Sequence, residues 1–186
     1  NNLALAKLFL SNLWHRFSEN SIVTPAITGL FNPNALRALA DNGIKFVIGD
    51  NSRPELVSLY NKHWGRYTTV ATNGYNGTLI VPRFPVDVFY NSSNFEELQS
   101  EFNTLFASDY DRPQTLAQIL ARNARDASEN LFEYNYAPYM FHQANLRYVN
   151  YGSWGSESLL SKWFKDVIAA YRRVSTLPMM SVQFKV

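Results

Sequence analysis

Hydrophobic and polar residues alternate between helical and strand spacing, so the sequence predicts a mixture of helices and strands. A helix is expected over Pro33–Asp41, because the Asn32-Pro33 pair is a typical helix start and the Asn42-Gly43 turn a typical stop. The apolar run IKFVIG at residues 44–49 follows directly and has the pattern of a buried strand. A short strand at residues 22–23 before the helix completes the strand, helix, strand order of a parallel sheet.

Turn-forming and capping residues separate the other predicted elements. The run Ser93-Asn94-Phe95-Glu96 is a capping box that starts a helix, and the helix expected from about Ser156 has the most regular apolar spacing in the chain. No repeat, low-complexity tract or linker interrupts the pattern, so we expect one α/β domain or part of one. The further expected helices begin at Leu3, Glu55 and Pro113, and the further strands cover residues 67–72, 78–82, 139–142 and 181–184.

Composition and charge narrow the class of protein. The chain has 186 residues, of which 46% are hydrophobic and 17% charged, as in a globular domain. The net charge of +2 comes without a basic block, which argues against nucleic-acid or membrane-surface binding. No segment is apolar enough over a sufficient length to span a bilayer. The chain opens with Asn1-Asn2 in place of an initiator Met, so we expect it to be part of a longer protein.

The chain contains no cysteine, so disulfides and thiolate metal sites are excluded and the compartment must be inferred from other features. Two sequons, Asn76-Gly77-Thr78 and Asn91-Ser92-Ser93, lie in polar, turn-like stretches where a glycan acceptor would be exposed. They favour a secreted protein that is glycosylated at Asn76 and Asn91.

The segment YNYAPYMFHQANLR, residues 134–147, carries the strongest candidate for chemistry. Its short apolar run ends on His142, where the end of a strand in an α/β fold would deliver a side chain to the site. Gln143, Asn145 and Arg147 follow and offer donors and acceptors for a polar substrate. The alternative is a histidine satisfied by a backbone carbonyl.

Charged residues follow other predicted strands. Asp50 and Arg53 would lie at the same sheet edge as His142, although Asp50 also suits an Asx-turn or helix cap and Arg53 a surface ion pair. Arg83 stands in the stiff sequence PRFP, which suits an orienting role toward a carboxylate or a sugar. The alternative for Arg83 is a structural contact with Asp87.

Several known sites are missing. The three histidines, His15, His63 and His142, show no HxxxH or HExxH spacing, so this chain alone encodes no zinc site. There is also no GxSxG elbow, P-loop or GxGxxG motif. Aromatic residues form 15% of the chain, and Tyr151 and Trp154 suit either stacking on a sugar or packing in the core.

Three segments carry a family resemblance. These are SIVTPAITGLFNPN at residues 21–34, NGIKFVIGDNSRP at residues 42–54 and PYMFHQANLR at residues 138–147. Together and in this order they resemble the fungal galactosaminogalactan deacetylases, which belong to the wider class of NodB-like polysaccharide de-N-acetylases.

The resemblance implies part of a distorted (β/α) barrel in a secreted or cell-wall-associated protein that removes acetyl groups from N-acetylgalactosamine units. In that class an upstream Asp-Asp motif and an upstream HxxxH motif bind a divalent metal such as zinc and supply the base. Neither motif is in this chain. Residues 1–186 therefore correspond to the C-terminal part of the catalytic domain, and its implied partners are the rest of that domain and an N-acetylated polysaccharide.

The resemblance also implies roles for individual residues. His142 would be the general acid that protonates the leaving amine in a metal-assisted hydrolysis, and imidazole suits this role because it titrates near neutral pH. Asp50 would orient the imidazole, and Arg83 would tether the upstream catalytic Asp. Many relatives carry an Arg-x-Pro-Tyr motif where this chain has Thr24-Pro25, so the tethering arginine of that motif is missing here. The expected substrate contacts are Thr24, Asn51, Arg53, Tyr139, Asn145 and Trp154.

Two other functions are compatible with the sequence. One is a carbohydrate-binding or inactive barrel relative in which the aromatic residues bind glycan without cleavage. The other is a structural role for a fragment of the full protein. An intact upstream Asp-Asp pair and HxxxH motif would distinguish the enzyme from the binding protein.

Overall fold

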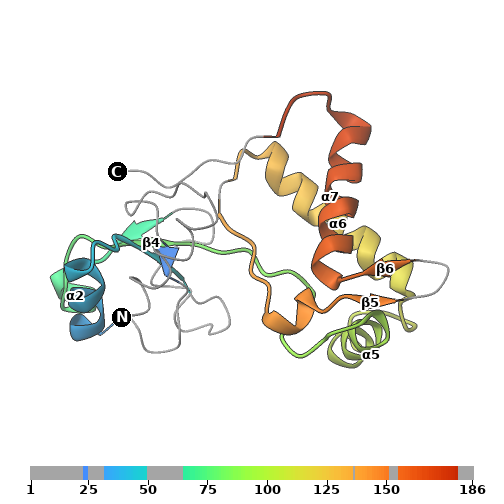
Figure 1. Ribbon diagram of the computed structural model, residues 1–186, viewed down its shortest axis with the longest axis horizontal. Coiled ribbons are helices and arrows are strands. Elements are labelled where there is room, and N and C mark those ends of the chain that lie inside the picture. The colour runs from blue at the N-terminus through green and yellow to red at the C-terminus, as the bar shows by residue number, and fades with distance from the viewer. Residues whose placement is uncertain (1–22, 25–31, 50–64, 136, 151–154, 180–186) are drawn as a thin grey trace. The chain divides into compact units, whose positions relative to one another are not determined.

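The computed structural model describes residues 23–24, 32–49, 65–135, 137–150 and 155–179, which confirm a mixed α/β fold (Figure 1). These residues group into two compact units, which divide between Arg83 and Phe84. The elements predicted over residues 3–17, 55–63 and 181–184 lie outside the described residues, and the closure of a barrel stays a prediction.

The first unit contains a four-stranded sheet with the strand order β1-β2-β4-β3. β1 (Val23–Thr24), β2 (Phe46–Ile48) and β4 (Leu79–Val81) run parallel, whereas β3 (Arg66–Tyr67) pairs antiparallel with β4 at the edge. In this register Phe46 lies opposite Leu79, and Leu79 lies opposite Tyr67. β2 and β4 therefore begin at the same end of the sheet at which β3 ends.

Helix α2 (Pro33–Asp41) joins β1 to β2 and has the bounds that the sequence predicts. The Asn32 side-chain oxygen accepts a hydrogen bond from the Ala35 N–H at 2.9 Å, which caps the helix start. Gly43, with a φ of +78°, makes the left-handed turn after it. Leu36 of this helix is fully buried. Because β1 and β2 pair in parallel, β1, α2 and β2 form the expected strand, helix, strand unit.

The strand predicted over residues 67–72 is wrong beyond Tyr67, because the chain turns into the short helix α4 (Val70–Asn73). The Thr69 hydroxyl accepts from the Thr72 N–H and caps this helix. Gly74 ends it with a φ of +67°, and a Cβ at this position would lie 2.4 Å from Pro33 Cγ. A glycine is therefore required here both for backbone conformation and for space.

The described part of the second unit contains three α-helices, the 3₁₀ helix η2 (Gln143–Leu146) and a small antiparallel hairpin (Figure 1). Helices α6 (Leu116–Phe132) and α7 (Leu159–Val174) pack along each other, and α5 (Phe95–Leu105) packs on α6. Strands β5 (Val149–Asn150) and β6 (Ser156–Glu157) form the antiparallel hairpin before α7. No helix in the described ranges has the length and apolar character needed to cross a membrane. The buried core residues include Val88, Phe95, Leu98, Leu120, Ala124, Ala127, Leu159, Trp163 and Val167.

The helix caps of this unit are close to those predicted. The α5 cap is Asn94, one residue after the predicted Ser93; its side chain accepts from the Glu97 N–H at 2.8 Å. The Glu97 carboxylate in turn accepts from the Ser93 N–H at 2.7 Å, so a reciprocal cap is present with its register shifted by one residue. Helix α6, predicted from Pro113, begins after a capping box of Thr115 and Gln118.

Asp87 connects the start of this unit to α6. Its carboxylate pairs with Arg122 at 3.2 Å, and Arg122 donates to the Tyr110 hydroxyl at 2.7 Å. Burial raises the pKa of Asp87 above its ordinary value and Asp126 adds to the rise, while the Arg122 guanidinium opposes both. The ionised carboxylate is therefore less favourable in the folded protein than in the unfolded chain.

We expect Asp87→Asn to flatten the pH dependence of stability in mild acid. The folded protein binds the Asp87 proton more tightly than the unfolded chain, so the free energy of unfolding falls as the pH rises from about 4 through the raised pKa. The variant lacks this fall. Urea denaturation at a series of pH values measures it, with Asp109→Asn, an exposed carboxylate in a loop, as the control. An identical pH dependence in wild type and Asp87→Asn would contradict the assignment.

Candidate functional site

His142 ends a short extended segment in the second unit. Tyr139 forms an isolated parallel bridge with Phe84. The Phe84 N–H donates to the Pro138 carbonyl at 2.9 Å, and the Met140 N–H donates to the Phe84 carbonyl at 3.4 Å. The predicted strand is thus reduced to a single bridge, after which the chain enters the 3₁₀ helix η2 (Gln143–Leu146) at His142.

Asn145 fixes the backbone around His142. Its side-chain oxygen accepts from the His142 N–H at 2.8 Å, and its own N–H donates to the His142 carbonyl at 3.0 Å. Its side-chain amide donates to the Phe89 and Ser92 carbonyls, both at 2.8 Å. Because the residue is 0% exposed, the predicted substrate contact does not fit, and Asn145 instead locks His142 to the turn at residues 89–92.

His142 is half-buried. Its ring meets the Tyr90 ring edge-on, with the ring centroids 6.1 Å apart and the planes at 72°. Tyr90 is 69% exposed, so this contact borders on solvent. Within the described part of the chain neither imidazole nitrogen has a hydrogen-bond partner. The described residues thus provide no backbone carbonyl that binds the His142 ring, which was the alternative considered for this histidine.

Tyr139 belongs to the core beneath this segment. Its hydroxyl donates to the Ala127 carbonyl of α6 at 3.2 Å, and its ring lies 5.0 Å from Trp163 and 5.5 Å from Phe84. Burial raises the pKa of Tyr139 above its ordinary value, against a smaller opposing effect of the hydrogen bond with Asn130. The predicted substrate contact does not fit this packing, because both the ring and the hydroxyl are already engaged.

Trp163 supports the same segment from α7. It is 6% exposed and its ring also meets Phe141 edge-on, 5.0 Å between centroids. Its Nε1 is buried without a hydrogen-bond partner among the described residues. The two aromatic residues that precede His142 in the segment, Tyr139 and Phe141, thus pack against one indole.

Arg83 follows β4 in the first unit, directly after the fully buried Pro82. Arg83 is only 8% exposed, so its side chain is packed inside the protein whatever role it has at a site. Asp87, the alternative partner considered for it, pairs with Arg122. Because Arg83 and His142 belong to different units, their convergence on one substrate stays a prediction.

The remaining residues predicted for the site are Thr24, Asp50, Asn51, Arg53 and Trp154. Asp50, Asn51, Arg53 and Trp154 lie outside the described residues. Thr24 lies in β1, where its backbone pairs with Val47 of β2. These assignments remain predictions.

Both predicted glycan acceptors are exposed. Asn76 lies in the turn that leads into β4, and Asn91 lies in the turn after Tyr90. Exposure fits the requirement for an acceptor, and glycosylation itself stays a prediction.

No sequence pattern pointed to Tyr90, which contacts His142 next to the turn that Asn145 holds. A further hollow of about 440 Å³ lies beside the start of α5, lined in part by Asn94, Glu96, Arg147 and Asn150. Arg147 is the first residue after η2 and donates to the Ser93 hydroxyl at 3.1 Å. Whether the polar residues after His142 reach a substrate stays a prediction.

No three His, Asp or Glu side chains in the described ranges gather into a group that would hold a metal ion. The donor set needed for zinc is thus not provided by this part of the chain. We therefore assign no catalytic step to a metal here.

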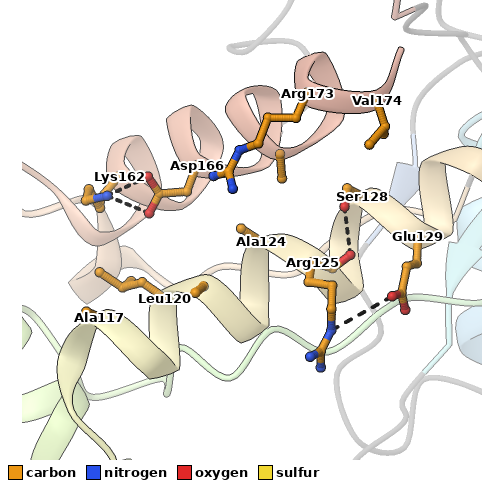
Figure 2. Close-up of a pocket in the computed structure, with 12 residues that line it drawn as sticks. Ala117, Leu120, Ala124, Arg125, Ser128, Glu129, Lys162, Asp166, Arg173 and Val174 are labelled. Atoms are coloured by element: carbon orange, nitrogen blue, oxygen red, sulfur yellow. Dashed lines mark hydrogen bonds and ion pairs between the residues drawn. The ribbon is translucent and has the colours of Figure 1, made fainter.

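Figure 2 shows a hollow of about 590 Å³ between α6 and α7, with a floor of small residues that includes Ala117 and Ala124. Its charged rim is largely neutralised. Lys162 pairs with Asp166 along α7, and Arg125 pairs with Glu129 along α6. None of the predicted site residues lines this hollow, so we do not consider it a catalytic site.

Comparisons with known proteins identify the family. The model of the Agd3 deacetylase domain matches residues 1–185. The search of curated proteins gave no match. A solved structure described as the crystal structure of Agd3, a novel carbohydrate deacetylase, is similar with a TM-score of 0.68 and 29% sequence identity. The match covers 90% of this chain and 26% of that one. These findings confirm the resemblance inferred from the sequence, and the chain belongs to the Agd3 deacetylase domain family.

Proposed function

We propose that this chain is part of a carbohydrate deacetylase that removes acetyl groups from an N-acetylated hexosamine polysaccharide, with N-acetylgalactosamine as the main unit. The observation that carries this proposal is the family match over residues 1–185, which includes the His142 segment. The described elements would form part of a (β/α) barrel. The ligands of a divalent metal would come from outside the described residues, and the protein would act outside the cell.

The chemistry requires a proton donor. Water adds to the acetamide carbonyl, the carbon–nitrogen bond breaks, and the products are acetate and a free amine. The amine leaves poorly as an anion, so a proton must reach its nitrogen as the bond breaks. In this proposal an N–H of the protonated His142 ring supplies that proton. The role is supported because His142 is only half-buried and its ring nitrogens make no hydrogen bond to the described residues.

The structure around His142 suits this task. Asn145 holds the backbone of His142 with two hydrogen bonds and ties it to a second turn, so the imidazole has a defined starting position. Such positioning is worth as much to a general acid as its chemical type, since a displacement of about 1 Å can cost on the order of 100-fold in rate. In the proposed mechanism Asp50 orients the imidazole of His142, and Arg83 tethers the upstream catalytic Asp.

The test is acetate release by the full-length protein from a polymer of N-acetylgalactosamine, with an N-acetylglucosamine oligomer as the comparison substrate. We expect acetate and free amines to appear in equal amounts from the galactosamine polymer. Binding of either polymer without acetate release would favour the carbohydrate-binding alternative instead.

Removal of metal is expected to abolish acetate release. If the ligands lie elsewhere in the protein, prolonged dialysis against a strong chelator should lower the rate at least 100-fold, as for enzymes in which a metal activates water. Adding back zinc should restore it. Dialysis against chelator presaturated with zinc is the control. Full activity in the metal-free protein would exclude the metal from the mechanism.

A further inference from the structure

One hollow in the first unit is not used by the proposed reaction. It has a volume of about 360 Å³, within the range of small-molecule sites. It lies at the end of the sheet where β2 and β4 begin and β3 ends, because Phe46, Leu79 and Tyr67 all line it. The opposite ends of β2 and β4 lead to Asp50 and Arg83.

The hollow combines an apolar floor with aromatic walls. Ile44 is 9% exposed and Phe46 is 4% exposed, and both contribute to the floor. Tyr67 and Tyr75 also line it, and Tyr67 is 60% exposed. An exposed tyrosine on an edge strand leaves a large ring surface in water, which a ligand with an apolar face would cover.

Three polar side-chain groups around the hollow have no partner among the described residues. Within the described residues, the hydroxyls of Tyr67 and Tyr75 and the ammonium of Lys45 have no hydrogen-bond or ion-pair partner. All three side chains line the hollow. A ligand would thus find two ring faces, two hydroxyls and one cation around an apolar floor. This set matches a hexose ring, whose C–H face packs on aromatic rings while its hydroxyls take hydrogen bonds.

We propose that this hollow is a subsite for one N-acetylated hexosamine unit of a polysaccharide; the ligand class rests on the proposed function. Tyr67 provides the stacking surface, and the acetyl methyl group packs against the apolar floor. Lys45 sets the preference for the acetylation state, because its ammonium donates to a carbonyl or hydroxyl oxygen but repels the protonated amine of a deacetylated unit. The subsite therefore holds acetylated stretches of polymer and releases deacetylated ones.

The test measures binding of polymer, not acetate release, and uses the full-length protein. In this protein Asn76 is replaced by Gln, so that no glycan attached there can enter the hollow beside it. The probes are an N-acetylgalactosamine polymer and the same polymer after chemical deacetylation, at a pH where its amines are protonated. We expect Tyr67→Ala to weaken binding of the acetylated polymer by about tenfold, the effect of losing one aromatic contact of about 1.4 kcal/mol. Tyr67→Phe should retain most of the binding, since it keeps the ring.

Two further variants sharpen the test. Tyr134→Ala is the matched control, because Tyr134 is 89% exposed and belongs to the second unit. Lys45→Gln should narrow the difference in affinity between the acetylated and deacetylated probes. Circular dichroism and the melting temperature show whether each variant is folded.

Equal binding by wild type and a folded Tyr67→Ala would overturn the subsite, as would an equal loss in the Tyr134→Ala control. Because the readout needs no acetate release, the two proposals can fail separately. A protein that releases no acetate but loses binding on Tyr67→Ala would retain the subsite and lose the enzyme. A protein that deacetylates normally but binds independently of Tyr67 would do the reverse.

Discussion

Replacement of His142 by Ala is expected to lower kcat for acetate release by roughly 10²–10⁴-fold, the usual contribution of a general acid. The loss arises because no other group would deliver a proton to the leaving amine at that position. Folding should be little affected: the imidazole is half-buried and has no hydrogen bond to the described residues, so truncation leaves no polar group unpaired.

The experiment compares His142→Ala with Gln143→Ala in the full-length protein, since Gln143 is the exposed next residue in the chain. kcat, KM and the melting temperature are measured for both. A general acid predicts a fall in kcat with a nearly constant KM, loss of one limb of the pH profile and partial rescue by added imidazole. An unchanged kcat in a folded His142→Ala protein would remove this residue from the mechanism.

Replacement of Asn145 by Ala is expected to destabilise the protein by about 3 kcal/mol. It leaves the His142 N–H and the carbonyls of Phe89 and Ser92 without the partner that the fully buried Asn145 side chain provides. Each buried group that loses its hydrogen bond costs on the order of 1–3 kcal/mol, with partial recovery if water enters. Urea denaturation followed by circular dichroism measures the loss.

Asn103→Ala is the matched control. Asn103 also makes two side-chain hydrogen bonds, both with the backbone of Gln114, but it is only half-buried, so water replaces them and the cost should be about 1 kcal/mol. Asn145→Asp gives a second measurement, because its carboxylate would face two carbonyls and its pKa would rise. That variant should therefore lose stability as the pH increases through the raised pKa. Equal losses for Asn103→Ala and Asn145→Ala would contradict the buried clamp.

Local signals explain which elements were predictable. Helix α2 has its predicted bounds because its cap, Asn32, and its stop, Gly43, lie within the helix's own neighbourhood. The strand predicted after Tyr67 is wrong because the Thr69 cap turns the chain into α4, and the apolar and polar spacing there does not reveal a cap. Spacing reports which residues share a face, whereas a cap depends on one side-chain hydrogen bond.

The roles within the candidate site depended on distant partners. Asn145 was predicted to contact substrate, but its acceptors at Phe89 and Ser92 lie more than 50 residues away in the sequence. Tyr139, which was also predicted to contact substrate, packs against Trp163, a partner that the spacing of residues in the sequence does not reveal. His142 was identified from its place at the end of an apolar run together with the family resemblance, and its half-buried position is compatible with that choice.

The indole of Trp163 gives the candidate site an optical reporter. Among residues 1–186, Trp14, Trp64 and Trp154 lie outside the described residues, and replacing these three by Phe would leave Trp163 as the one tryptophan of this stretch, beneath the segment that ends at His142. Its N–H is buried and has no hydrogen-bond partner among the described residues, so its fluorescence should be shifted to the blue. A sugar that displaces Tyr139 and Phe141 on binding would change the emission wavelength of Trp163. Stopped-flow mixing would then measure the rate of that change.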